Sequence, residues 1–213
     1  MTLFYFYCYF TIRMNNFDIL KHFNIHGADV YLAHFDGAVE IKPVLPPIRQ
    51  RAIEECSDGQ TKRQRYCVWR LLDYALRERI GKGVDGLDFA VDEHGKWSCN
   101  GGVHFSLSHS GSVVAVAVSE RPVSIDVEAV DEQRFNARLA SRILTEGELT
   151  LYSSVPQEQR PQMLAAAWTK KESLFKRDGS KSFVPSSIDT SAATTFSEKV
   201  AFGDNEFVLS VAV

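Results

Sequence analysis

The sequence has few cysteines, little net charge and no long apolar run, and each shortage excludes a class of protein. The four cysteines are Cys8, Cys56, Cys67 and Cys99. They form no C-x-x-C pair and no cluster with histidine at zinc-ligand spacing. A reduced cytoplasmic protein without a structural zinc site is the simplest interpretation.

The formal net charge is −3, so the chain has no overall basic field of the kind that nucleic acid attracts. An anionic ligand would need local cations. The apolar, aromatic run at residues 2–12 is much shorter than the roughly 20 residues that span a bilayer. It lacks the basic start and small-residue cleavage site of a signal peptide. We expect neither nucleic acid nor a membrane as a partner.

Residues 1–27 are predicted to be an N-terminal extension of unknown role, either an added strand or a loosely packed segment. Translation from Met14 is an alternative. With 213 residues and 45% hydrophobic content, the chain can bury one large core or two small ones. We predict an N-terminal subdomain at 28–118 and a C-terminal subdomain at 119–213.

Periodicity predicts the main elements. Apolar positions at helical spacing indicate a helix at 62–80, closed by glycines, and a second helix at 162–179. Thr145 and Glu148 have the spacing of a capping box. Each long helix contains a tryptophan, Trp69 or Trp168, and ends in basic residues and glycine, a weak sign of internal duplication. Strands are expected at 28–36, 113–118 and 207–213.

Two acids follow the apolar strand 113–118. Asp126 and Glu128, in the sequence S-I-D-V-E, are two residues apart, so on a strand they point to the same side. They repel each other unless a cation lies between them. The alternative is a solvated strand end, which is common for such pairs.

The helix at 162–179 carries a second polar group. Trp168, Glu172 and Lys176 are four residues apart and form one stripe, with Lys171 beside it. The alternative is an ordinary Glu–Lys pair, worth a few tenths of a kcal/mol (~0.3).

The run F-S-L-S-H-S at 105–110 alternates, so the neighbours Ser108 and His109 point apart and do not form a nucleophile–base pair. They suit contacts to phosphate oxygens instead. A capping serine and a surface histidine are the alternative. Further cations that could contact phosphate are concentrated in the first half of the chain: Arg49, Arg51, Lys62, Arg63, Arg65 and Lys96. The alternative is that they form a solvated helix face.

The order of F-S-L-S-H-S, S-I-D-V-E and W-T-K-K-E-S-L-F-K resembles the motif series of the 4′-phosphopantetheinyl transferases. The resemblance covers about 28–213 and is to the long, monomeric branch that activates surfactin synthetase. It implies an α+β fold, a pseudo-twofold pair of similar α/β subdomains, each a small antiparallel sheet packed with a long helix. Three departures are Ser124 for a glycine, Trp97 for a proline and Val127 between the acids.

The resemblance implies transfer of the phosphopantetheine arm of coenzyme A to a serine of an apo acyl or peptidyl carrier protein. Adenosine 3′,5′-bisphosphate is the other product. Asp126, Glu128 and Glu172 would hold Mg²⁺, which prefers hard oxygen ligands. Glu172 would also be the base and Lys176 the pyrophosphate contact. Implied nucleotide contacts are Ser108, His109 and Lys96 and, less securely, Arg49, Arg51 and Arg65.

Two other functions stay open from the residues alone. One is a non-catalytic module that binds coenzyme A or a carrier protein, and the intact acids argue against it. The other is a different Mg²⁺-dependent phosphoryl-transfer enzyme or hydrolase that uses the same three acids.

Overall fold

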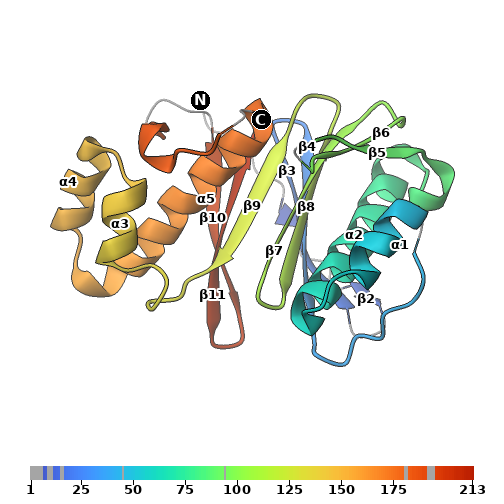
Figure 1. Cartoon of the computed structure of the whole chain (residues 1–213), viewed down its shortest axis with the longest axis horizontal. Helices are drawn as coiled ribbons and strands as arrows, with labels where there is room; N and C mark the ends of the chain where they lie inside the picture. Colours follow the sequence, from blue (N-terminus) through green and yellow to red (C-terminus); the bar gives the residue numbers. More distant parts are fainter. Residues whose placement is uncertain are drawn as a thin grey trace. The chain divides into compact units, whose positions relative to one another are not determined.

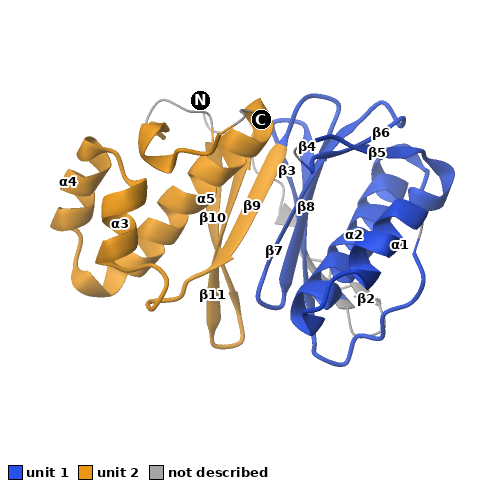
Figure 2. Cartoon of the chain, in the orientation of Figure 1, with its two compact units in different colours: residues 1–123, 213 blue, residues 124–212 orange. Residues whose placement is uncertain are grey.

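The computed structural model describes residues 7–8, 12–14, 17–44, 46–93, 95–179, 182–190 and 195–213. The chain divides into two units, residues 1–123 together with Val213, and residues 124–212 (Figures 1 and 2). The sequence had placed this boundary between 118 and 119. In the described ranges no helix has the length and apolarity needed to cross a membrane.

The first unit is built on an antiparallel sheet with the strand order β1-β3-β4-β8-β7, and β2 also pairs with β3. Strand β3 lies inside the segment predicted to be an extension, so residues 17–25 are part of this sheet. Most of the aromatic run 2–12 lies outside the described residues. The strands are β1 (Tyr7–Cys8), β2 (Ile12–Met14), β3 (Phe17–Ile25), β4 (Ala28–Phe35), β7 (His104–Ser110) and β8 (Val113–Ser119).

Strand β8 is buried at every position because its run of valines and alanines packs on both faces of the sheet. Helix α2 (Gly59–Ile80) packs on this sheet through Trp69, Leu72 and Leu76. The helix begins at Gly59, three residues before the predicted start, and the side chain of its N-cap residue Asp58 accepts from the Thr61 N–H. The smaller elements are α1 (Pro47–Glu54), η1 (Val84–Gly86), β5 (Phe89–Val91) and β6 (Trp97–Cys99).

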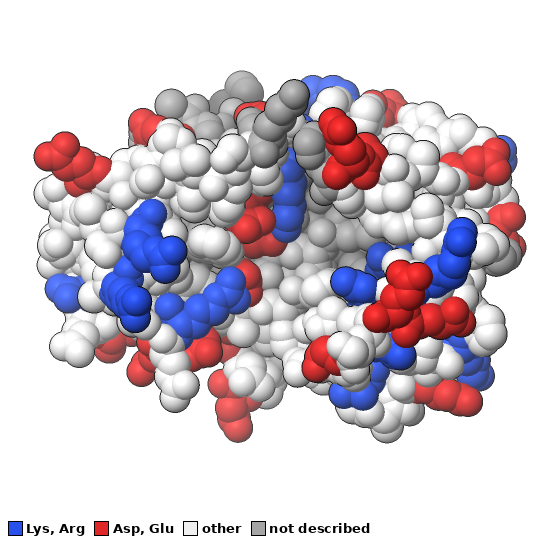
Figure 3. Space-filling model, viewed as in Figure 1, with Lys and Arg blue, Asp and Glu red and all other residues white. Residues whose placement is uncertain are grey.

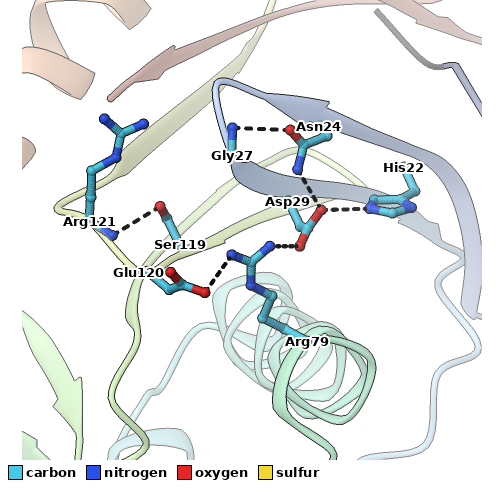
Figure 4. Close-up of polar contacts among 8 residues, drawn as sticks. All are labelled: His22, Asn24, Gly27, Asp29, Arg79, Ser119, Glu120 and Arg121. Carbon is cyan, nitrogen blue, oxygen red and sulfur yellow. Dashed lines mark hydrogen bonds and ion pairs between the residues drawn. The ribbon is translucent and has the colours of Figure 1, made fainter.

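A polar cluster joins β4 to the end of α2 (Figure 4). Asp29 accepts from Arg79 Nη1 at 2.7 Å and from Asn24 Nδ2 at 2.9 Å, and His22 Nε2 lies 3.4 Å from it. Arg79 also contacts Glu120 at 3.3 Å. No sequence motif pointed to this cluster.

The second unit has a three-stranded antiparallel sheet in the order β10-β11-β9. Helix α5 (Arg160–Asp178) packs on β9 and β11, and it ends at Gly179, whose φ of 66° is left-handed. The predicted capping box of Thr145 and Glu148 opens α4. The remaining elements are β9 (Ser124–Ala129), α3 (Ala137–Ile143), α4 (Glu146–Ser154), η2 (Gln157–Gln159), η3 (Pro185–Ser187), β10 (Thr195–Phe202) and β11 (Asn205–Ala212).

Each unit therefore combines an antiparallel sheet with one long helix, α2 in the first and α5 in the second. The predicted α+β class is confirmed. The pseudo-twofold relation between the two subdomains stays a prediction.

Candidate functional site

The acids of β9 meet the polar stripe of α5. Asp126 points to the side of the sheet on which α5 packs and is 4% exposed. The Lys176 ammonium lies 2.6 Å from Asp126 Oδ1 and 3.6 Å from Glu172 Oε2. The spacing of four residues places Glu172 and Lys176 on one stripe of α5, and the packing of α5 on β9 brings that stripe to Asp126.

The charges at this point are unbalanced. Burial raises the pKa of Asp126 from 3.8 to about 6. Lys176 opposes this rise in pKa, and the negative charges of Glu172 and Glu128 add to it. Burial also disfavours the charged form of Lys176, yet Asp126 and Glu172 outweigh that effect and raise the lysine pKa. One lysine therefore serves several carboxylates, and the site keeps an excess of negative charge.

Glu128 has a different partner. Arg134 Nη1 and Nη2 each donate to one Glu128 oxygen at 2.6 Å. The Arg134 guanidinium carbon lies 5.0 Å from the Phe135 ring centroid and 5.7 Å from that of Trp168. Sequence reasoning missed Arg134 because it lies in the loop between β9 and α3, where no period relates it to Glu128.

Lys171, beside the predicted stripe, has a structural role. Its side chain is fully buried, with Nζ 2.7 Å from Glu148 Oε2. It also donates to the carbonyls of Pro185 at 3.0 Å and Ile188 at 2.6 Å. The lysine therefore ties α4 and the segment after α5 to the motif helix.

The predicted nucleotide contacts belong to the first unit. Arg49 is 6% exposed, with its guanidinium carbon 4.9 Å from the Trp69 centroid and 5.7 Å from that of Trp97. Its Nη2 donates to the Arg65 carbonyl at 2.5 Å, and Arg65 Nη1 donates to the Ala52 carbonyl at 2.7 Å. Burial, helped by Arg65, lowers the pKa of Arg49 to about 10. These two arginines thus fasten α1 to α2, whereas Arg51 is exposed.

Ser108 and His109 are neighbours on β7, opposite Ala115 and Val114 of β8. Ser108 is 7% exposed. A separate cavity of about 120 Å³ in this unit is lined by Lys96, Trp97 and His104, among others. The Lys96 N–H donates to Asp92 Oδ1 at 2.9 Å, which closes the turn before β6.

The carboxylates of Asp126, Glu128 and Glu172 are hard oxygen donors whose charges repel one another, so their chemistry fits a divalent cation such as Mg²⁺. Their arrangement shows the chain's own cations in contact with them, Lys176 on Asp126 and Arg134 on Glu128. Within the described ranges, no three His, Cys, Asp or Glu side chains are gathered so that they could hold a metal ion. Metal binding at these acids requires local rearrangement.

Comparison with known proteins finds similarity to the same superfamily. Residues 122–205 match the sequence model of the 4′-phosphopantetheinyl transferase superfamily. The predicted resemblance to this superfamily is confirmed. The matched region contains Asp126, Glu128, Glu172 and Lys176.

Curated members of the superfamily align with about half of the chain. A 97-residue match, 46% of this chain and 40% of the relative, is 32% identical to the 4′-phosphopantetheinyl transferase gsp of Aneurinibacillus migulanus. The 4′-phosphopantetheinyl transferase of Bacillus subtilis is 28% identical over 51% of this chain and 49% of its own. The enzyme AcpT of Salmonella typhimurium is 31% identical over 52% and 59%. The chain thus spans about half the length of the curated relatives that it matches.

Proposed function

We propose that this protein transfers the 4′-phosphopantetheine arm of coenzyme A to a serine hydroxyl of an apo acyl or peptidyl carrier protein, in a Mg²⁺-dependent reaction. The observation that carries the proposal is the meeting of Asp126, Glu172 and Lys176 between β9 and α5, in the matched region. The names of the relatives support the same reaction. The acids Asp126 and Glu128 on a strand and Glu172 on a helix, with Lys176 and Arg134 as cations, suit phosphoryl transfer, which depends on positioning and charge.

In the proposed reaction, the serine oxygen forms a bond to the phosphorus of the pantetheine arm. The bond from that phosphorus to the bridging oxygen breaks, and adenosine 3′,5′-bisphosphate leaves. Glu172 is the candidate base for the serine proton, directly or through a water molecule. Lys176, whose pKa is raised, stays a cation and suits the pyrophosphate.

Asp126, Glu128 and Glu172 would hold the metal ion. When bound, Mg²⁺ would neutralise the charge that develops on the leaving phosphate. The chain's part is to keep the three carboxylates on adjacent faces of β9 and α5 and to bury Asp126. Ser108 and His109 on β7 are proposed to contact the nucleotide phosphates, together with Lys96. Arg51 fits such a role better than Arg49 or Arg65, whose guanidinium groups bind backbone carbonyls. A cytoplasmic monomer remains the prediction.

The test is intact-mass spectrometry of a panel of apo carrier proteins incubated with the full chain, coenzyme A and Mg²⁺. We expect one or more carriers to gain the mass of the phosphopantetheine arm. Glu172→Gln should lower the rate at least about 100-fold, because a metal ligand and candidate base is lost. Glu146→Gln, which removes an exposed acid of the same unit, should leave it unchanged.

Three outcomes would contradict the proposal. Tight coenzyme A binding with no mass gain on any carrier would indicate a binding module. Release of pantetheine phosphate to water without a carrier would indicate a hydrolase. An unchanged rate in Glu172→Gln would remove this residue from the site.

A further inference from the structure

Arg134 binds the Glu128 carboxylate through both terminal nitrogens of its guanidinium group. The two N–H···O distances are each 2.6 Å, and the Glu128 side chain is 13% exposed against 45% for Arg134. Two parallel charge-assisted hydrogen bonds fix the plane of a carboxylate as well as its position. The Glu128 rotamer is therefore set by a residue outside the three motifs.

The protein holds Arg134 in place from two sides. Its guanidinium group lies against Phe135 and Trp168, the first residue of the α5 motif. Phe135 is 1% exposed, and its N–H donates to the Asp131 carbonyl at 2.7 Å, which anchors the loop. A planar guanidinium can stack on these rings and so suits this aromatic contact better than a lysine ammonium does. The motif tryptophan thus supports the arginine that holds Glu128.

Arginine and a divalent cation compete for the same oxygen atoms. Mg²⁺ needs a carboxylate oxygen directed at it, in near-octahedral geometry. The two hydrogen bonds from Arg134 to Glu128, called the Arg134 fork below, occupy both Glu128 oxygens, whereas Asp126 accepts from Lys176 through Oδ1. Glu128 is therefore the proposed ligand whose geometry is most strongly fixed by a partner other than a metal.

We propose that Arg134 is a positioning residue that fixes the Glu128 carboxylate through both of its oxygens, and that a divalent cation must displace at least one of these two hydrogen bonds to bind Glu128. This role for Arg134 rests on the proposed metal-dependent function of Asp126, Glu128 and Glu172. It adds a residue that the three motifs do not contain.

The sign of the effect follows from the competition. A divalent cation has to break the Arg134–Glu128 pair before it binds Glu128. Without that pair, the affinity of the site for the divalent cation should rise. Any nearby positive charge also repels the cation, and Lys and Arg side chains gather over α3 on the drawn face of the second unit (Figure 3). A control must therefore separate the fork from the charge.

The experiment measures Mn²⁺ binding to the full chain by electron paramagnetic resonance and Mg²⁺ binding by calorimetry, both without coenzyme A. Arg134→Met removes the fork and the charge, whereas Arg134→Lys removes the fork alone. Arg138→Met removes an exposed charge four residues away on α3 and leaves the fork. From the usual worth of such pairs we expect about fivefold tighter binding for Arg134→Met, about threefold for Arg134→Lys and less than about twofold for Arg138→Met.

Three results would overturn this role for Arg134 while leaving the metal site intact. The first is wild-type affinity in both Arg134 variants, and the second is an equal gain in Arg134→Met and Arg138→Met. The third is weaker binding in Arg134→Met with unchanged thermal unfolding. If the wild-type chain binds neither cation, with or without coenzyme A, the proposed metal site fails as well, and the two failures are thereby distinguished.

Discussion

Asp29 in the first unit and Asp126 in the second are both shielded strand carboxylates that contact a basic side chain from a helix. Their pKa values nevertheless move in opposite directions. The pKa of Asp29 falls from 3.8 to about 2, and that of Asp126 rises from 3.8 to about 6. The distance to the basic group is nearly the same, 2.7 Å from Asp29 to Arg79 and 2.6 Å from Asp126 to Lys176.

The difference lies in what else surrounds each carboxylate. Burial alone would raise the pKa of Asp29, but hydrogen bonds from His22, Asn24 and Arg79 outweigh it (Figure 4). Asp126 is more deeply buried, and Lys176, which contacts it, also contacts Glu172. Hydrogen-bond donors therefore dominate the pKa of Asp29, whereas burial and the charges of Glu172 and Glu128 oppose Lys176 at Asp126.

This balance is the physical difference that we expect between a structural ion pair and a cation-binding site. A carboxylate surrounded by hydrogen-bond donors stabilises the fold when it ionises, and its negative charge is already compensated without a ligand. A buried carboxylate among other acids costs stability when it ionises, and an added cation relieves that cost. Asp126 is of the second kind, as expected for the proposed transferase.

The largest effect should come from Asp126→Asn. The raised pKa means that the folded protein binds a proton more tightly than the unfolded chain does. The free energy of unfolding of the wild type therefore falls as the pH rises from 3.8 to about 6, and it stays lowered above that pH. Asparagine does not ionise, so at pH 7 without divalent cations the variant should be more stable by up to about 3 kcal/mol.

Urea unfolding at pH 4 and pH 7 measures this effect. The two proteins should converge at pH 4, and Asp204→Asn, at an exposed turn, should follow the wild type at both. Added Mg²⁺ should stabilise the wild type and not Asp126→Asn. If the difference in free energy of unfolding between Asp126→Asn and the wild type is the same at pH 4 and pH 7, ionisation of Asp126 does not destabilise the fold.

The contrast between the two aspartates also marks what sequence could predict. The periods of strand and helix predicted that Asp126 and Glu128 share one side of a strand and that Glu172 and Lys176 share one stripe of a helix, because each period is local. The meeting of Asp126 with that stripe was implied only by the family resemblance. The capping box of Thr145 and the long helices followed from equally local patterns, whereas the α+β class was implied by the family resemblance.

Contacts between elements far apart in sequence could not be predicted in this way. Asp29 and Arg79 are separated by 50 residues, and no period links them. Arg134 is close to Glu128 in sequence, but its side chain is placed by a loop that Phe135 anchors. Arg49 was expected to bind phosphate, yet its contacts with Trp69 and Trp97 depend on the packing of the core. Tertiary packing decides all three, and composition gives no sign of it.

The opposite sign is expected for Asp29→Asn. The lowered pKa means that ionised Asp29 stabilises the fold above pH 3.8, and this stability is lost as the pH falls toward about 2. The side chain is 15% exposed, so we expect the variant to lose about 1–2 kcal/mol at pH 7. Urea unfolding at pH 7 measures the loss, and transfer per folded molecule should be unchanged. Wild-type stability in the variant would place Asp29 among the surface ion pairs.

The smallest effect should come from Glu120→Gln, which tests whether Arg79 acts through Asp29 alone. Arg79 Nη2 contacts Glu120 at 3.3 Å, but the Glu120 side chain is 78% exposed, and such solvent-exposed ion pairs contribute little to stability. Glutamine keeps the length of the side chain and removes its charge, so the free energy of unfolding should change by less than about 0.5 kcal/mol. Urea unfolding of Glu120→Gln, Asp29→Asn and the double variant measures the coupling between the two acids. A loss in Glu120→Gln as large as in Asp29→Asn would show that Arg79 needs both carboxylates, and the cluster would then resemble the shared cation of the Asp126 site rather than contrast with it.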